Sequence, residues 1–481
     1  MSAPTAPRAR WTLVVTGLAL FMTALDNLVV GVALPSIRAD LGGSIEALEW
    51  TVNAYTLAFA VLLITGAALG DRFGRRRMFI AGISVFTLAS ALAALAPSIE
   101  ALVAARGLQG LGAAMVTPLT LTLISEAFPP ERRGAALGIW GGISGLGVAV
   151  GPLVGGAVVE GIAWQWIFLL NVPVGLALIP LAGRALVESR GPDRELDLRG
   201  LVLAGAGLFG LTFGIIRGEA LGWTSATVLG SISLGVAALA AFVRWELRAP
   251  RPMLPMRFFA SRAFSATNGL SFTMFFGTFG AIFLLSQFFQ TAQGLSPFEA
   301  GLRTLPWTAM PMVVAPLAGI LGSRIGNRPL MAAGLALQAI GLAWIATVAS
   351  PDTPFTELIA PFALAGTGMA LVFPTAAETV LASVRASEAG KASGATNAIR
   401  EIGGVMGVAV LASVFSAHGG YESPLAFTDG VSAALPIAVV VLAVGAVLAL
   451  LTPGRGGAAQ ARATAAPGAG APVAQGAPAA G

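Results

Sequence analysis

The sequence predicts an all-α membrane protein with fourteen transmembrane helices, arranged as two six-helix halves with two further helices inserted between them. The composition is the first observation behind this prediction, since 56% of the 481 residues are hydrophobic and only 11% are charged. The mean hydropathy of +0.83 is far above that of a soluble domain. The other two observations are the spacing of the apolar runs and a repeated pattern of glycines.

The apolar runs have the length that a membrane demands, because about 20 apolar residues in a helix span the hydrocarbon core. Each run is separated from the next by a short polar or charged segment. The fourteen runs are 11–35, 49–70, 78–97, 100–124, 134–159, 165–183, 199–217, 223–243, 264–289, 303–323, 329–349, 356–380, 394–417 and 431–452.

The basic residues predict the orientation, because Lys and Arg favour cytoplasmic loops. With the N-terminus inside, 28 Lys and Arg residues distribute almost entirely to the inside. The exceptions are Arg38, Arg217 and Arg303 outside, and Arg106 and Arg400 within spans. We therefore expect a multi-pass protein of the cytoplasmic (inner) cell membrane with both termini cytoplasmic. The net charge of +5 follows from this topology and does not indicate a nucleic-acid partner.

Residue types that carry catalysis or bind metals are scarce. The chain has no cysteine, which excludes disulfides and thiolate metal sites. Its one histidine, His418, falls in a predicted outside loop, so no Ser-His-Asp triad is expected within the membrane. The phosphate-binding pattern GxxxxGK[ST] does not occur in the sequence. The sequence predicts no metal, no cofactor and no enzymatic activity.

A repeated skeleton of glycines and prolines supports the two halves. The segment GDRFGRRR at 70–77 recurs in weaker form as GSRIGNR at 322–328, at an offset of 252 residues. We interpret these matches as a duplicated six-helix unit. At an offset of 256, Gly110, Gly112, Pro118, Gly138, Gly147 and Gly151 match Gly366, Gly368, Pro374, Gly394, Gly403 and Gly407.

The duplication and the charged linkers together predict the domain organisation. The N-terminal half precedes two inserted helices, and the tail is too poor in large apolar residues to fold. The predicted segments are a cytoplasmic N-terminus (1–10), the N-terminal half (11–183), a cytoplasmic linker (184–198), the inserted helices (199–243), a second linker (244–263), the C-terminal half (264–452) and a disordered cytoplasmic tail (453–481).

Five motifs in order along the chain resemble the fourteen-helix branch of the drug:proton antiporter family within the major facilitator superfamily. The resemblance runs from about Trp11 to Thr452 and implies the major facilitator fold. One departure is Gln165, where an arginine is usual. The motifs are LDNLVVGVALP (25–35), GDRFGRRR (70–77), LVAARGLQGLGAA (102–114), GIWGGISGLGVAVGPLVGG (138–156) and WQWIFLLNVPVG (164–175).

The fourth of these motifs matches the family's antiporter pattern at every position. In lipid, small residues let helix backbones approach closely, so we expect this helix to pack tightly against a helix of the other half. Proline is expected to bend it. The resemblance implies that this face seals the transporter and favours exchange over uniport, whereas an ordinary packing groove is the alternative. The positions are Gly138, Gly147, Gly151, Pro152, Gly155 and Gly156.

Four ionisable residues fall at membrane depth, where charge is costly and usually functional or paired. Asp26 is the first candidate for the proton-carrying residue, with a structural hydrogen bond as its alternative. Arg106 matches the arginine that the resemblance implicates in proton transfer, and a stabilising ion pair is the alternative. Arg400 and Glu401 pair locally in one interpretation. The family more often has glutamine at the position of Glu401, so in the other interpretation Glu401 is a second protonation site or gives a preference for cationic substrates.

The loop after the second span is a candidate conformational latch. Its aspartate can accept from backbone N–H groups or pair with an arginine across the domain interface. In the duplicate, Ser323 replaces this aspartate, so the charged contact is expected on one side only. The family's first glycine falls on Ala67, which weakens the match. The latch residues are Gly70, Asp71, Arg72, Gly74, Arg75 and Arg76.

The function that fits best is a proton-coupled antiporter that exports amphipathic drugs, antibiotics or metabolites by alternating access. A proton symporter or facilitator for uptake is the alternative, and a membrane sensor or enzyme is a third class. The expected partners are a small amphipathic molecule, protons and the lipid bilayer, with the protein as a monomer. Candidate residues of a substrate cavity are Asn27, Asn53, Tyr55, Trp140, Gln287, Gln290 and Phe373.

Overall fold

A computed structural model of the chain describes residues 6–42, 45–191, 197–250 and 252–454, and within these ranges it contains helices and no strand. Thirteen helical segments are long and apolar enough to cross a membrane. The 32-residue helix α5 completes the predicted set of fourteen. The predicted tail (453–481) lies outside the described residues from position 455 onward, as do the first five residues of the predicted N-terminus.

The helices follow the predicted runs in order. The N-terminal half comprises α1 (Ala6–Leu41), α2 (Ile45–Phe73), α3 (Arg75–Ala94), α4 (Ile99–Ala127), α5 (Pro130–Gly161), and the short α6 (Trp166–Leu169) with α7 (Asn171–Ala185). The inserted pair is α8 (Leu198–Leu221) and α9 (Ala226–Glu246), followed by α10 (Arg257–Ala260) in the linker.

The C-terminal half contains two helices with irregular geometry. The run at 303–323 forms two helices that meet at Ala309, and one turn of π-helix extends the first long helix of this half. The elements are α11 (Arg262–Gln287) with η1 (Phe288–Ala292), α12 (Pro297–Thr308), α13 (Met310–Ile325), α14 (Asn327–Val348), α15 (Phe355–Ala382), η2 (Ala386–Glu388), α16 (Ala389–His418) and α17 (Pro424–Leu450).

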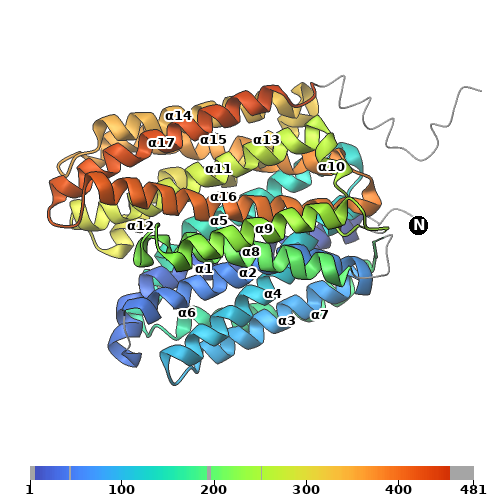
Figure 1. Cartoon of the computed structure of the whole chain (residues 1–481), viewed down its shortest axis with the longest axis horizontal. Helices are drawn as coiled ribbons and strands as arrows, with labels where there is room; N and C mark the ends of the chain where they lie inside the picture. Colours follow the sequence, from blue (N-terminus) through green and yellow to red (C-terminus); the bar gives the residue numbers. More distant parts are fainter. Residues whose placement is uncertain (1–5, 43–44, 192–196, 251, 455–481) are drawn as a thin grey trace, which may run out of the picture.

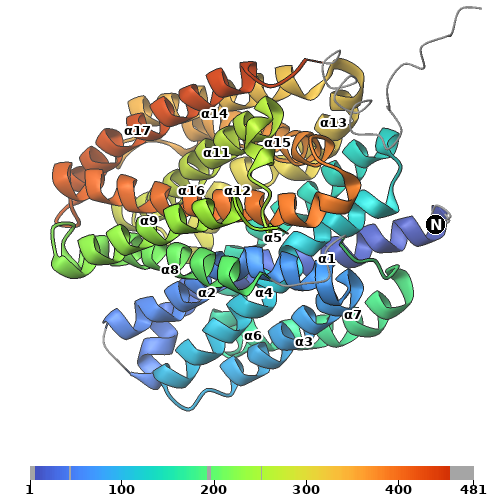
Figure 2. The same cartoon turned by 45° about the vertical axis from the view of Figure 1, so that its right-hand side comes forward.

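The two halves lie side by side with their helices running in nearly the same direction (Figure 1). In that view α3 and α7 lie on the lower side and α14 and α17 on the upper side, with α8 and α9 in front of the junction. The start of α1 and the end of α17 lie at the same end of the bundle. The turned view in Figure 2 keeps this arrangement. An even number of spans brings the two ends of the chain to the same end of the bundle.

Two seams join the halves. At one, α5 packs against α13 and α12; at the other, α16 packs against α2. A Cβ atom added at Gly319 of α13 would lie 2.1 Å from the carbonyl oxygen of Gly134 of α5, so the two backbones are in direct contact. On the second seam, a Cβ at Gly394 would lie 2.8 Å from that of Ala67. Ala67, the departure from the family pattern, is therefore accommodated by a glycine on the facing helix.

The antiporter glycines divide between two neighbours of α5, which corrects the expectation of a single face against the other half. Gly147 and Gly155 face α1 of the same half, close to Phe21 and Val29 respectively. Gly138 faces Ala315 of α13 in the other half. Glycines occur on more than one side of α5, so a neighbouring helix can pack closely against each of these sides.

Three other positions of this motif complete the picture. Gly151 is buried, and Gly156 lies at ordinary contact distance from Phe298 of α12. The helix continues through Pro152, whose side chain lies outside the described part of the structure, so the bend expected there stays a prediction.

The inserted pair of helices packs over the seam between α2 and α16. Helix α8 packs against both α2 and α16, and α9 packs on the outer side of α8. Trp223, between the two inserted helices, donates from Nε1 to Ser413 Oγ of α16 at 2.6 Å. The inserted pair therefore bridges the halves on the α2–α16 side only.

Candidate functional site

Asp26 and Arg106 form a buried ion pair between α1 and α4. Arg106 Nη1 lies 2.5 Å from Asp26 Oδ2, and neither side chain has more than 1% of its surface exposed. The sequence placed these residues in separate motifs, and the structure brings them together. An ion pair of this kind holds two charges that would be costly at membrane depth if either stood alone.

Two amide side chains complete the surroundings of the carboxylate. Asn171 of α7 donates to Asp26 Oδ1 at 2.7 Å, and Gln109 of α4 donates to the same oxygen at 3.0 Å. Gln109 also donates to Ser90 Oγ of α3 at 2.8 Å and accepts from Arg106 at 2.8 Å. Three donors from two helices, α4 and α7, thus converge on one carboxylate of α1, an arrangement that suits its ionised form.

Tyr55 separates this ion pair from the centre of the protein. Its ring centre lies 4.5 Å from Arg106 Cζ, close enough for a cation–π contact. Arg106 Nε also donates to the carbonyl oxygen of Thr51 at 2.9 Å; Thr51 lies on α2, one turn before Tyr55. Tyr55 therefore contacts the guanidinium on one side and a central cavity on the other.

The cavity lies between the halves and has a volume of about 180 Å³. Its lining comes from α1, α2, α4 and α5 of the first half and α11, α13, α15 and α16 of the second. Among the described residues that line it, Glu401 is the one carboxylate. Four predicted cavity residues are in the lining, namely Asn27, Tyr55, Trp140 and Phe373.

Three predicted cavity residues are not in this lining. Gln287 is half-buried and accepts from the Tyr421 hydroxyl at 2.7 Å, and Gln290 is exposed. Both lie where α11 passes into the π-helical turn, beyond the cavity. Asn53 lies on α2 two positions before Tyr55 and so points elsewhere. Residue type and position along an apolar run could not predict which way these side chains point.

Arg400 and Glu401 do not form the local pair that sequence neighbours suggest. Glu401 lines the cavity, whereas the Arg400 side chain is buried against aromatic rings. Adjacent residues on a helix point about 100° apart, which separates the two charged groups. Within the described chain, no hydrogen-bond acceptor reaches any guanidinium nitrogen of Arg400.

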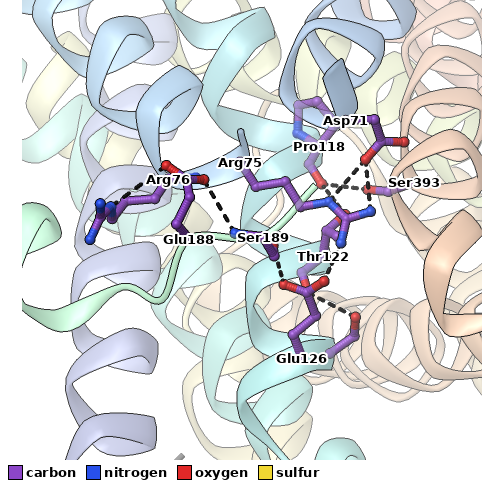
Figure 3. A network of polar contacts seen from close by, with 10 residues as sticks. Asp71, Arg75, Arg76, Pro118, Thr122, Glu126, Glu188, Ser189 and Ser393 are labelled. Carbon is purple, nitrogen blue, oxygen red and sulfur yellow. Dashed lines mark hydrogen bonds and ion pairs between the residues drawn. The ribbon is translucent and has the colours of Figure 1, made fainter. Parts of the chain in front are cut away.

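The loop between α2 and α3 forms a charged network at the arginine-rich end (Figure 3). Asp71 Oδ1 accepts from Arg75 at 2.9 Å and 2.7 Å, and Arg75 also donates to Glu126 of α4. The arginine partner of Asp71 thus belongs to its own half. Asp71 reaches the other half differently, because a Cβ added at Gly390 near the start of α16 would lie 2.5 Å from Asp71 Oδ1. A carboxylate at the N-terminus of a helix is stabilised by the helix dipole.

The segment that follows α7 holds this loop in place. The backbone N–H of Arg75 donates to Ser189 O at 2.9 Å, and that of Gly191 donates to Asp71 O at 2.8 Å. Glu188 accepts from the Arg76 backbone at 3.1 Å and lies 3.7 Å from its side chain. Gly74 has a φ of +112°, which a side chain would strain, and this turn places the loop against Glu188.

Two remaining latch residues have simpler roles. Gly70 is buried against Leu119 of α4, where an added Cβ would come within 2.3 Å of the leucine side chain. Arg72 lies 4.9 Å from the ring centre of Phe73, and it is not part of the charged network drawn in Figure 3.

The duplicate loop of the second half reproduces the backbone but not the charge. Gly326 has a φ of +92° and ends α13 as Gly74 ends α2. Asn327 donates to Glu378 at 3.2 Å, in the place of the Arg75 contact with Glu126. Ser323 donates to the Ile320 carbonyl of its own helix at 2.7 Å.

Asparagine in place of Asp71 is expected to slow transport severalfold, because it removes the negative charge facing the α16 N-terminus and weakens the bond to Arg75. Each of these contacts contributes on the order of 1 kcal/mol. Drug efflux from cells that express equal amounts of protein would measure the effect. Ser323→Ala, at the duplicate position, serves as the control and should keep the wild-type rate; equal slowing in both variants would contradict this prediction.

Sequence analysis missed six side chains of these networks, Ser90 of α3 among them. Gln109 and Asn171 lie within two of the quoted motifs, so a search for amides at mid-span would have found them. Glu126, Glu188 and Ser189 lie at helix ends or in a linker, where polar residues are ordinary, and the sequence carried no signal for them.

The comparison with known families decides the assignment. The model of the Major Facilitator Superfamily matches residues 16–408 and 267–476. The chain is a member of the Major Facilitator Superfamily. The two seams and the central cavity described above are features of this superfamily member's own structure. Among the solved structures with a similar fold is the human organic anion transporter MFSD10 (TETRAN), with a TM-score of 0.63 at 15% identity over 92% of this chain and 99% of that one.

Several curated relatives of this superfamily member are named as resistance or export proteins. It is 36% identical to the tetracenomycin C resistance and export protein of Streptomyces glaucescens, over 86% of this chain and 77% of the relative. It is 38% identical to the puromycin resistance protein pur8 of Streptomyces alboniger, over 92% of this chain and 91% of the relative.

Proposed function

We propose that this protein exports amphipathic small molecules in exchange for protons, by alternating access of the central cavity to the two sides of the membrane. The observation that carries the proposal is the position of the cavity. It lies between the two halves, and Tyr55, which lines it, contacts Arg106 of the buried pair that Arg106 forms with Asp26. The resistance and export functions named for the relatives support drug efflux.

The cavity suits amphipathic molecules, because apolar and aromatic side chains line most of it and a few polar groups can orient a ligand. Asn27 and Glu401 are two of these polar groups, on opposite halves. A ligand that contacts both would bias the relative positions of the halves. This is the requirement for a substrate that drives a conformational change.

Proton coupling would act through the charge state of Asp26. When Asp26 takes a proton, its ion pair with Arg106 loses its attraction, and the guanidinium is left against Tyr55 at the cavity wall. A change of charge in the pair is thereby transmitted to the surface that a substrate contacts. The membrane potential supplies about 2.3 kcal/mol per proton per 100 mV, enough for roughly a fiftyfold gradient of a neutral substrate.

Alternating access requires contacts that form in one state and break in the other. The Asp71 contact with the start of α16 and the glycine contact between α5 and α13 are the candidates, because each joins the two halves at the arginine-rich end. The bias of basic residues supports a cytoplasmic location for this end. The proposal includes an inner cell membrane location and a protein that acts as a monomer.

Substrate-induced proton movement in proteoliposomes tests the proposal. A pH gradient is imposed on vesicles that contain the purified protein, and ethidium, puromycin and tetracenomycin C are added in turn. We expect at least one compound to dissipate the gradient, and empty vesicles to show no such effect. Transport of a compound without proton movement would contradict coupling, and proton movement in the same direction as the compound would indicate a symporter.

A further inference from the structure

Four aromatic rings form one continuous wall of the central cavity. Trp140 stacks on Phe373 with 5.3 Å between ring centres and 10° between planes. Phe373 stacks on Phe275 at 6.2 Å, and Phe275 stacks on Phe279 at 5.4 Å. All four rings line the cavity, and they come from α5, α11 and α15. We call these four residues the aromatic wall.

Arg400 lies against the aromatic wall and does not itself line the cavity. Its guanidinium carbon is 4.9 Å from the ring centre of Phe373 and 5.6 Å from that of Phe275. Its side chain is almost entirely buried, and within the described residues its three nitrogens have no hydrogen-bond acceptor. Arg106, the other arginine at membrane depth, has a carboxylate partner.

An unpaired cation at this depth is costly and requires a compensating interaction. The two ring faces supply part of it, because a cation is attracted to the negative face of an aromatic ring. That attraction draws electron density toward Arg400. The cavity-facing sides of the rings therefore become less negative, and arginine keeps its charge at any physiological pH.

We propose that Arg400 makes the aromatic wall a binding surface for planar, electron-rich or anionic aromatic molecules and disfavours planar cations there. The guanidinium is covered, so a ligand experiences its charge only through the rings. A flat ligand that stacks on the wall comes closest to this charge. A planar cation in the same place is repelled by the second cation behind the rings. The inference deepens the proposed export function and rests on it.

Glu401 does not oppose this preference to the same degree. It lies next to Arg400 in sequence but faces the cavity, where water and ligand can reach it. A carboxyl group in that position can exchange a proton, whereas Arg400 cannot. The two residues together thus determine which ligand charge the cavity prefers. The charge of Arg400 is constant, whereas that of Glu401 can change.

Fluorescein and rhodamine 123 test the proposal, because the anionic and the cationic dye share the same planar xanthene core. Fluorescence polarisation with the purified protein in lipid nanodiscs gives a Kd for each dye, with no proton gradient present. We expect the wild-type protein to bind fluorescein more tightly. The preference is the Kd of rhodamine 123 divided by the Kd of fluorescein. Arg400→Met should lower this ratio at least about tenfold, the effect expected for a desolvated cation–π partner.

Three variants serve as controls. Arg400→Lys keeps the charge and should keep most of the preference, and Glu401→Gln should move it further toward fluorescein. Arg303→Met removes an arginine that lies 5.3 Å from the ring centre of Phe355, away from the cavity, and should change nothing. Phe373→Leu should weaken both dyes, because it removes the stacking surface.

An unchanged dye preference in Arg400→Met would overturn the proposal, and so would an equal loss of both dyes or a failure of the wild type to bind either one. Loss of folding is not expected, since methionine replaces a buried charge for which no hydrogen-bond acceptor lies within reach in the described residues. The assay measures binding without a gradient. A protein that binds the dyes as expected but moves no protons would contradict the proposed antiport and leave this inference standing.

Discussion

Asparagine at position 26 is expected to abolish substrate-induced proton movement, because the carboxylate that would carry the proton is gone. The same change leaves Arg106 buried without its anionic partner, which costs on the order of 3–5 kcal/mol of folding stability. Loss of activity in Asp26→Asn alone therefore has two explanations. The double variant Asp26→Asn with Arg106→Gln removes both charges, so most of the stability should return while proton movement stays absent.

The measurement compares proton movement in proteoliposomes with the thermal stability of the same samples. Asp40→Asn is the matched control, since Asp40 lies on the same helix, is exposed, and accepts from Trp164 at 2.9 Å and Gln165 at 3.0 Å. It should couple like the wild type. If the double variant moved protons in response to substrate, Asp26 would be a structural residue and the coupling site would lie elsewhere.

Alanine at position 319 is expected to stop transport by preventing closure of the arginine-rich end. The added Cβ would lie 2.1 Å from the carbonyl oxygen of Gly134, so the backbones of α5 and α13 must separate. Overpacking of this kind costs about 1–3 kcal/mol, enough to reduce the closed state by roughly five- to 150-fold. Folding is less affected, because the state with this end open does not need the contact.

Distance measurement between spin labels tests this expectation directly. The chain has no cysteine, so Arg132→Cys on α5 and Arg324→Cys on α13, both exposed at the same end, can be labelled without background. In the Gly319→Ala protein the distance distribution should shift to longer values. Gly107→Ala is the control, because an added Cβ there meets nothing within 4 Å. A distribution identical to the wild type would show that the glycine contact does not control closure.

Side-chain direction and cross-helix pairing account for most differences between the sequence analysis and the structure. The fourteen spans were predictable because hydrocarbon thickness fixes the length of each apolar run. The charged residues at depth were equally visible, because charge is rare there. The partners of Asp26 were not, since Arg106, Gln109 and Asn171 come from helices far apart in sequence.

The sequence by itself determined the helical membrane fold and the family, because both depend on composition, on the spacing of apolar runs and on local motifs. Only the tertiary structure decided which residues meet. It placed Gly147 and Gly155 against α1, and it put Arg400 behind aromatic rings away from Glu401. The physical reason is that lipid offers helices little hydrophobic drive to choose a face. The choice depends on close packing and polar contacts among all fourteen helices at once.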